Sequence, residues 1–237
     1  IDANTGVFSW TPTEAQGGTA PSVTITVTDS GTGTLADSET FTISVGEVND
    51  APTITSNGGG ASAGVTIAEN TTAVATVTAT DADGPSLTYS IAGGADAARF
   101  TIDASTGALG FVTAPNFEAA TDSSADNVYD VVVQASDGAL TATQSLAVGV
   151  SNVNEAPTAL APGSAAVNIQ ALGGTSVATL VATDPDTGDA ISFSLVDDGG
   201  GRFAVDAASG QLSVASGARL DDQGGTPFVL VVRVTDA

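Results

Sequence analysis

The residues of this sequence that could do chemistry are carboxylates and carboxamides gathered in short clusters. Two hinge segments, EVNDAP at 47–52 and NVNEAP at 152–157, join acids and asparagines to a proline, and they lie 157 − 52 = 105 residues apart. Two acid pairs, DAD at 81–83 and DPD at 184–186, recur at a similar distance. Oxygen ligands of this kind suit calcium, which takes about 6–8 of them with tolerant geometry. A cation site is therefore one hypothesis, and turn capping by aspartate is the alternative.

The composition excludes most other chemistry. The chain of 237 residues has 27 acidic side chains, no histidine and no cysteine. Zinc, haem and copper sites of the usual kinds are therefore excluded, as are Ser–His and Cys–His nucleophile pairs. A glycosidase with paired carboxylates stays open in principle, but catalytic acids are rarely copied along a chain, and we predict that the protein is not an enzyme. An EF-hand is excluded because its twelfth position would be Ala92 or Leu195 rather than glutamate.

The net charge limits the partners. Only four basic residues, all arginine, oppose the 27 acids, which leaves a formal charge of −23. Such a chain repels nucleic acid and anionic membranes, and it has no apolar run long enough to cross a bilayer, so we predict neither partner. A solvated surface that only promotes solubility is the alternative explanation of the acidity.

The elements that must position these acids repeat along the chain. The motifs recur in the same order with a period of roughly one hundred residues, which is right for a small β domain. The recurring motifs are IDANTG (1–6), IDASTG (102–107) and VDAASG (205–210); TATDADG (78–84) and VATDPDTG (181–188); and TVTDSG (26–31), VQASDG (133–138) and VRVTDA (232–237).

Short alternating runs in the complete middle repeat predict strands, and turn residues separate them every 8–15 residues. The predicted strands are 73–80, 87–91, 99–103, 107–112, 129–136 and 143–150, with one helical turn at 96–99. We therefore predict an all-β protein made of tandem immunoglobulin-like Greek-key sandwiches with about seven strands per repeat.

The hinges set the predicted domain boundaries. Residues 1–50 are the C-terminal half of one repeat, 51–155 a complete repeat, and 156–237 a repeat lacking its last strand. The half-repeat is expected to be poorly packed or completed by a neighbour. Tyr129 is predicted to be a core residue, and Trp10, which alternates with Phe8, is predicted to lie in a core strand. These aromatics then leave no platform for a sugar.

The ordered set of motifs resembles tandem cadherin repeats and bacterial cadherin-like repeats. In that family an xEN glutamate, an LDxE acidic pair, a DxNDNAP linker, a DxD pair and a later xDxG aspartate share calcium between consecutive domains. The corresponding stretches here include AEN at 68–70, NFE at 116–118, both hinges and both acid pairs. The resemblance covers nearly the whole chain.

The resemblance implies calcium ligands at both hinges. For the hinge between the second and third repeats these are Glu69, Asn116, Glu118, Asn154, Glu155, Asp184, Asp186 and Asp236. For the hinge between the first and second repeats they are Glu14, Asn49, Asp50, Asp81, Asp83 and Asp137. The six carboxylates of the former set would repel one another unless a cation joined them, which favours calcium beside the resemblance; magnesium, which needs near-ideal octahedral geometry, fits less well.

Some positions depart from the family pattern. Both hinges are one residue shorter and lack its second asparagine. The aspartate of LDxE is Pro12 in one repeat and Asn116 in the next, so the first hinge is expected to hold fewer ions. The xEN position of the third repeat reads Leu172-Gly173, which argues against a further site there. The segment 1–14 is closer to the dystroglycan-type variant of bacterial surface proteins.

The predicted function is that of a stalk. A calcium-rigidified segment of a large secreted or cell-surface bacterial adhesin, partnered by calcium and by neighbouring repeats, accounts for the acids at the hinges. The alternatives are a recognition module for another cell-surface protein, a glycan or a second copy of itself, and a calcium-free spacer.

Overall fold

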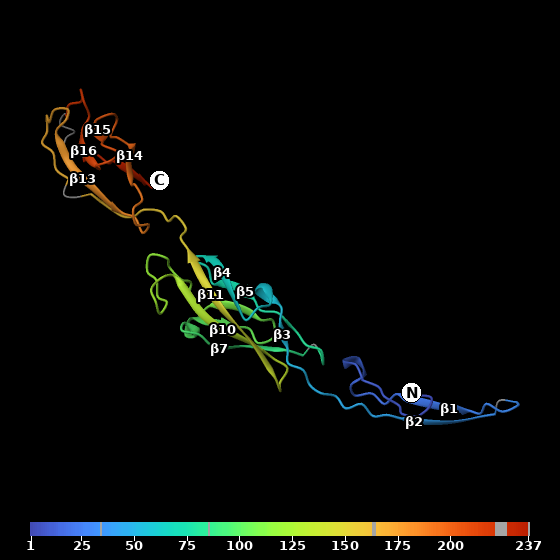
Figure 1. Cartoon of the computed structure of the whole chain (residues 1–237). Coiled ribbons are helices and arrows are strands. Elements are labelled where there is room, and N and C mark those ends of the chain that lie inside the picture. Colours follow the sequence, from blue (N-terminus) through green and yellow to red (C-terminus); the bar gives the residue numbers. More distant parts are fainter. Residues whose placement is uncertain (34, 85, 163–164, 221–226, 237) are drawn as a thin grey trace. The chain divides into compact units, whose positions relative to one another are not determined.

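The computed structural model describes residues 1–237 except 34, 85, 163–164, 221–226 and 237 (Figure 1). Strands and three short 3-10 turns are the only regular elements in that part of the chain, and none of its helices is long and apolar enough to cross a membrane. Contacts divide the chain into two compact units. The first is Ile1–Ile67, Thr71–Ala114 and Thr121–Val150; the second is Ala68–Asn70, Pro115–Ala120 and Ser151–Ala237.

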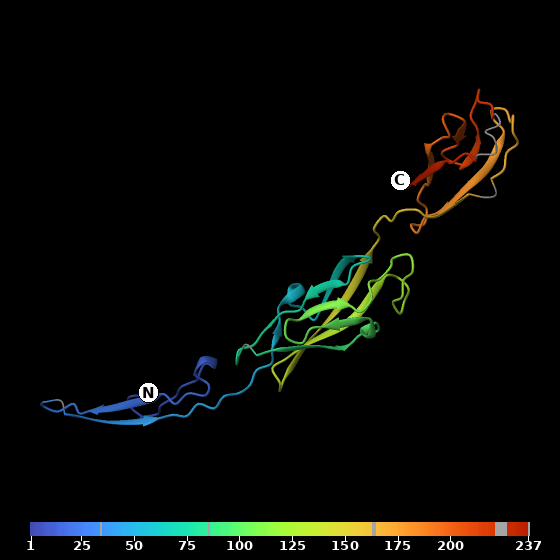
Figure 2. The same ribbon diagram turned by 180° about the vertical axis from the view of Figure 1, so that it is seen from behind.

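The first fifty residues contain one antiparallel hairpin, blue in Figure 2. The hairpin consists of β1 (Ser22–Thr28) and β2 (Ala36–Thr42), and the 3-10 turn η1 (Glu14–Gln16) precedes it. No described residue of this segment is buried. Trp10 and Phe8 lie outside the strands and are 36% and 39% exposed, so the prediction that they occupy a core strand is wrong. The reason is that the described residues here form a single two-stranded sheet with no second layer.

The middle repeat is a sandwich whose main sheet has the order β4-β11-β10-β7 and whose second sheet has the order β5-β9-β8. The predicted strand at 73–80 is split, because β5 pairs with β9 while β6 pairs with β3. The predicted turn at 96–99 is present as η3. The elements are β3 (Thr53–Ile54), η2 (Ser56–Gly58), β4 (Ser62–Ala68), β5 (Ala73–Thr76), β6 (Ala79–Thr80), β7 (Thr88–Gly93), η3 (Ala97–Arg99), β8 (Phe100–Ile102), β9 (Ala108–Phe111), β10 (Val128–Ser136) and β11 (Thr141–Ser151).

Alternation along β10 builds the core of this sandwich. Tyr129, Val131 and Val133 are at most 1% exposed, as the two-residue period of a strand requires. The ring of Tyr129 meets Phe111 of the other sheet edge-on, with centroids 5.0 Å apart, and Phe111 packs on Phe100. Tyr129 is thus a core residue, as predicted.

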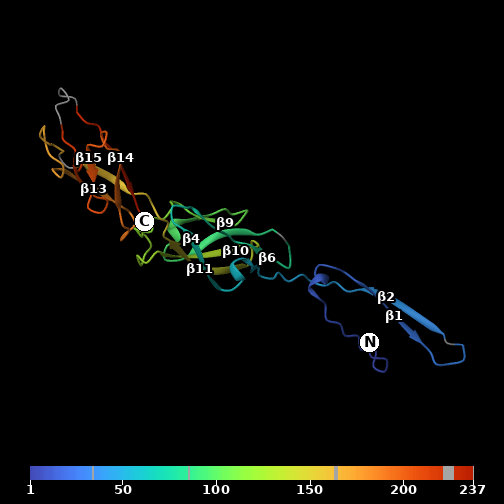
Figure 3. The same ribbon diagram turned by 90° about the horizontal axis from the view of Figure 1, so that it is seen from above.

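The third repeat has two sheets, ordered β12-β13-β16-β15 and β14-β17. Three of its strands, β13, β14 and β15, are labelled in Figure 3. Its core contains Ala178, Phe203, Leu212, Val214 and Leu220. The elements are β12 (Thr158–Pro162), β13 (Ser176–Thr183), β14 (Ser192–Asp197), β15 (Phe203–Val205), β16 (Gln211–Val214) and β17 (Val231–Thr235). The prediction of an all-β protein made of immunoglobulin-like sandwiches is confirmed.

Candidate metal centres

One group of acids, the second-hinge cluster, lies entirely within the second unit. We define it by its six carboxylates: Glu69, Glu118, Glu155, Asp184, Asp186 and Asp236. One oxygen each from Glu69, Glu118 and Glu155 lie within 4.8 Å of one another. These three residues come from the end of β4, the loop after β9 and the hinge after β11, so the fold brings together acids that are distant in sequence.

Glu69 is the anchor of this cluster. Its side chain is 1% exposed, and its two oxygens accept hydrogen bonds from the backbone N–H groups of Phe117 and Val153, both at 2.8 Å. Hydrogen bonds to an ionised acceptor are among the stronger ones in proteins. Glu69 therefore fixes the loop that carries Glu118 and the hinge that carries Glu155.

The hinge is also bonded to the DPD acids. The N–H of Glu155 donates to Oδ2 of Asp186 at 2.6 Å, and the N–H of Asp186 donates to Oδ1 of Asp184 at 3.0 Å. Asn154 Nδ2 donates to Oδ2 of Asp236 at 3.1 Å. The sequence-predicted acids and Asn154 therefore belong to one connected group.

Three carboxylate oxygens of the second-hinge cluster are buried without a hydrogen-bond partner: Oε2 of Glu118, Oδ2 of Asp184 and Oδ1 of Asp186. Burial raises the pKa of Glu118, and the neighbouring charges of Glu69, Asp186 and Glu155 raise it further. Buried ionised oxygens are unfavourable unless they are paired or coordinate a metal. The donor set, which is oxygen throughout, fits calcium.

The first-hinge cluster, in the first unit, repeats this network. Its six carboxylates are Glu14, Glu47, Asp50, Asp81, Asp83 and Asp137. The N–H of Asp50 donates to Oδ2 of Asp83 at 2.6 Å, and the N–H of Asp83 donates to Oδ1 of Asp81 at 2.9 Å. Oδ2 of Asp81 is buried without a partner, like Oδ2 of its counterpart Asp184.

The carboxamide contact is repeated as well. Asn49 Nδ2 donates to Oδ2 of Asp137 at 2.7 Å, and this bond is the main reason why the pKa of Asp137 is lowered. The backbone N–H groups of Ala139 and Leu140 donate to the other oxygen of Asp137. Three backbone and side-chain contacts therefore recur, residue for residue, at both hinges.

Sequence reasoning missed Glu47. One carboxylate oxygen each from Glu14, Glu47 and Asp83 lie within 4.8 Å of one another, and a hydrogen bond with Glu47 is the main cause that raises the pKa of Glu14. The first acidic position of the DxNDNAP pattern was the signal that could have identified Glu47. Gly17 makes room for it, because a Cβ at Gly17 would collide with the Glu47 carboxylate.

Asn116 has a contact that favours a turn-capping role. Its Oδ1 accepts a hydrogen bond from the N–H of Ala119 at 2.7 Å. Asn116 as a metal ligand stays a prediction.

Other aspartates cap turns and need no ion. Oδ1 of Asp103 accepts from the N–H groups of Ser105 and Thr106 at 3.0 and 2.8 Å, and these bonds lower the pKa of Asp103. The equivalent Asp2 and Asp206 form the same turn with lowered pKa values. Turn capping thus explains the aspartates of the two IDxxxG motifs and of the equivalent VDAASG motif, but not the orphaned oxygens of the hinges.

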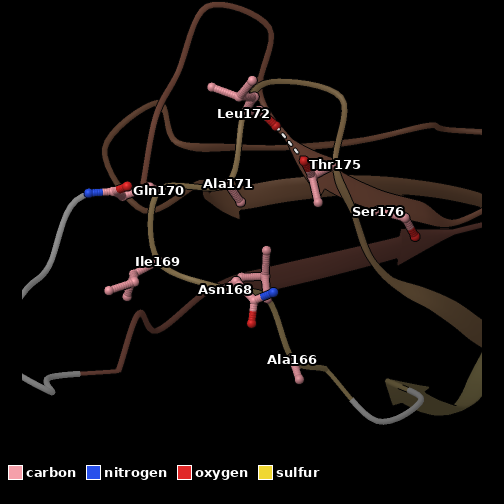
Figure 4. Close-up of a pocket in the computed structure, with 9 residues that line it drawn as sticks. Ala166, Asn168, Ile169, Gln170, Ala171, Leu172, Thr175 and Ser176 are labelled. Carbon is pink, nitrogen blue, oxygen red and sulfur yellow. Dashed lines mark hydrogen bonds between the residues drawn. The ribbon is translucent and has the colours of Figure 1, made fainter.

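A hollow in the third repeat is chemically different from the hinges (Figure 4). It is lined by residues 166–172, 175 and 176, none of which is acidic or aromatic. Ile169 and Leu172 are 68% and 66% exposed, and Thr175 Oγ1 donates to the backbone oxygen of Leu172. The hollow offers no carboxylate for a cation and no ring for a sugar.

Comparison with known proteins agrees with this architecture. Residues 1–46 match a family model described as "Putative Ig domain". The structure is similar to the protocadherin gammaB7 EC3-6 cis-dimer, with 27% identity and a TM-score of 0.56 over 94% of this chain and 56% of that one. It is also similar to protocadherin gamma B2 extracellular cadherin domains 3–6, with 27% identity, a TM-score of 0.55 and coverage of 94% and 57%. The chain therefore has the fold of tandem cadherin-like repeats.

A further cadherin structure, human CDH23 EC21-23, shows the same fold at 20% identity and a TM-score of 0.53, over 84% of this chain and 67% of that one. The present chain spans a little over half the length of the two protocadherin structures. Cadherin-like repeats are an adhesion-type fold, and the two acidic networks lie at the hinge segments between the sequence repeats.

Proposed function

We propose that these cadherin-like repeats form an extracellular adhesion segment whose hinges bind calcium. The observation that carries the proposal is the duplicated hinge network, in which equivalent acids, Asp81 and Asp184, each keep a buried oxygen without a partner. A turn-capping aspartate satisfies its oxygens with local N–H groups, so a purely structural role does not account for this repetition.

The residues that would hold calcium are those of the two clusters. In the second-hinge cluster, Glu69 and Glu118 come from the middle repeat, Glu155 from the hinge, and Asp184, Asp186 and Asp236 from the third repeat. When bound, calcium would supply the positive charge that these acids lack. The carboxylates themselves hold the hinge backbone, as the bond from Glu155 to Asp186 illustrates.

The biological role follows from this chemistry. If acids from consecutive repeats bind the same calcium ions, the angle between the two repeats would become fixed. Removal of calcium would let that angle vary. We place this function in the stalk of a large bacterial surface or secreted adhesin, partnered by calcium and by neighbouring repeats. The resemblance of residues 1–14 to the dystroglycan-type variant supports the bacterial assignment.

The test is thermal melting and small-angle scattering of the chain in calcium and then in excess chelator. Calcium at about 100 times its Kd should stabilise the folded state by about 2.7 kcal/mol, which melting measures. It should also narrow the distribution of distances within the molecule, which scattering measures. Glu155→Ala and Asp186→Ala should each remove most of the effect of the second hinge. Asp189→Ala is the matched control, since Asp189 is exposed in the same loop and belongs to neither cluster. If calcium at millimolar concentration changes neither observable, the proposal is wrong.

A further inference from the structure

One asparagine of the sequence is followed directly by glycine, in the pair Asn57–Gly58. The pair lies between β3 and β4 of the middle repeat, within the 3-10 turn η2. Every other asparagine precedes a residue with a side chain. Because glycine has no Cβ, its backbone nitrogen can approach the preceding side chain more closely than that of any other residue. Asn57 is therefore the side-chain amide of this chain that is most open to attack by its own backbone.

The reaction at such a pair is deamidation. A bond forms between the Gly58 nitrogen and Asn57 Cγ, the bond from Cγ to Nδ2 breaks, and ammonia leaves with the proton of the Gly58 N–H. Water then opens the five-membered imide at either of its carbonyl carbons, which gives aspartate or isoaspartate at position 57. No oxidant, reductant or enzyme takes part. The product carries a negative charge where the protein had a neutral amide.

The folded chain holds Asn57 in a conformation that does not react. Ring closure needs the Gly58 nitrogen on the same side of the Cα–C bond as Asn57 Cβ. At φ 51° and ψ 37° that nitrogen lies on the opposite side. Deamidation therefore requires rotation about this bond, and hence a local opening of the loop. The contacts that keep the loop closed set the rate.

Gln144 of β11 makes such contacts. Its side chain is fully buried, and its Oε1 accepts a hydrogen bond from Nδ2 of Asn57 at 3.3 Å. Its Nε2 donates to the backbone oxygens of Ser56 and Gly60 at 3.3 and 2.8 Å. One carboxamide thus joins both ends of the segment 56–60, and the reactive amide itself, to an inner strand of the main sheet.

The modified residue does not fit this arrangement. Nδ2 of Asn57 is a donor, whereas a carboxylate at position 57 offers only acceptors to Oε1 of Gln144. A buried acceptor that loses its donor is unfavourable. Gly58 is exposed, and a Cβ there would meet no atom within 4 Å, so water reaches the site once the loop opens.

We infer that Asn57–Gly58 is a site of spontaneous deamidation whose rate is set by Gln144, and that its modification releases the segment 56–60 from β11. The middle repeat then becomes less stable as the molecule ages. The site lies inside the one complete sandwich of the chain and does not depend on calcium or on the proposed function.

The sequence around the site makes the assay direct. A protease specific for aspartate and glutamate cuts after Asp50 and Glu69 and releases the peptide 51–69, in which Asn57 is the one asparagine and there is no glutamine. Aspartate at position 57 adds a cleavage point, whereas isoaspartate leaves the peptide whole but heavier than the amide form. Mass spectrometry of the whole chain, sampled and digested during incubation in mildly alkaline buffer, therefore gives both rate and product.

The folded wild type should deamidate at Asn57 at least about tenfold more slowly than the same chain in urea, which corresponds to an opening free energy of about 1.4 kcal/mol or more. Gln144→Ala should lose most of this protection. Leu146→Ala, which removes a buried side chain of the same strand, is the control for general destabilisation and should stay protected. Equal rates in the folded and the urea-treated wild type, or equal rates in the two variants, overturn the inference.

A second measurement tests the consequence and keeps the inference falsifiable if Gln144→Ala does not fold. Asn57→Asp introduces the aspartate product directly and should lower the Tm of the whole chain. Asn168→Asp makes the same change at an exposed asparagine of the third repeat and should leave the Tm unchanged. If Asn57→Asp melts at the same temperature as the wild type, modification does not release the loop and the inference is wrong.

Discussion

Replacing Glu118 by glutamine should change stability in opposite directions without and with calcium. Oxygens of Glu118, Glu69 and Glu155 lie within 4.8 Å of one another, and one oxygen of Glu118 is buried without a partner. The change keeps the size of the side chain and removes its charge. Without calcium it relieves repulsion, whereas with calcium it removes a ligand.

The oxygens lie within 4.8 Å of one another, so that distance gives the smallest repulsion between two of the charges. Two unit charges at that distance repel by about 3.5 kcal/mol at an effective dielectric constant of 20 and by about 0.9 kcal/mol in water. Because Glu118 is only half-buried, we take the lower end, about 1 kcal/mol. For a repeat of this size that free energy corresponds to a Tm higher by about 4–8 °C in chelator.

The assay is differential scanning calorimetry in chelator and in saturating calcium. The stabilisation by calcium should shrink by at least about 1.4 kcal/mol if the lost ligand weakens binding about tenfold. Asp130→Asn, an exposed site on β10 of the same repeat, is the control for the loss of one negative charge and should change neither value. A lower Tm of Glu118→Gln in chelator, or a stabilisation by calcium equal to that of the wild type, would refute the reasoning.

Three further predictions concern the fold. Gly107→Ala should destabilise the fold by about 3 kcal/mol or more, because Gly107 has φ +70° and a Cβ there would collide with the carbonyl oxygen of Val77. Gly6→Ala is the control: Gly6 has φ +69° but open space around it, so the change should cost about 1–2 kcal/mol. Equal losses of Tm in the two variants would contradict this prediction. Asp96→Ala should cost about 2–4 kcal/mol in denaturant unfolding, because Asp96 is 4% exposed and accepts two backbone N–H groups; a change below 1 kcal/mol would argue against that role. The pKa of Asp103 is lowered from 3.8 by backbone N–H groups, so its contribution is present above about pH 4 and is lost as the pH falls through the lowered value. The wild-type Tm should therefore fall more steeply than that of Asp103→Ala between pH 5 and pH 2.5, and parallel curves would exclude this contribution.

Much of the fold could be predicted from the sequence because strand periodicity and repeated motifs are local signals. The alignment of Tyr129 with Phe228 of the next repeat predicted the burial of Tyr129 correctly. The alternation of Trp10 with Phe8 predicted a core strand, and that prediction failed. Alternation says which residues share a face, but not whether a second sheet covers that face.

The candidate sites show the same limit. Repeat positions and the family resemblance identified most acids that the structure brings together, such as Asp81 and Asp184. They did not identify Glu47, because the equivalent residue of the second hinge is Asn152. Comparison of the two hinges therefore shows no shared acid at this position. The orphaned oxygens arise from tertiary packing, which no local pattern encodes.

The network at each hinge has a consequence for how such a protein changes its length. The acids of the second-hinge cluster come from both flanking sequence repeats, so the cluster belongs to neither repeat alone. Duplication of one complete period, about 105 residues from hinge to hinge, adds one repeat and one complete set of acids together. A deletion of one period removes both together. The segment that is duplicated or deleted is therefore one sandwich together with its share of the acids at both of its hinges. The number of repeats can change in this way without the evolution of a new set of hinge acids.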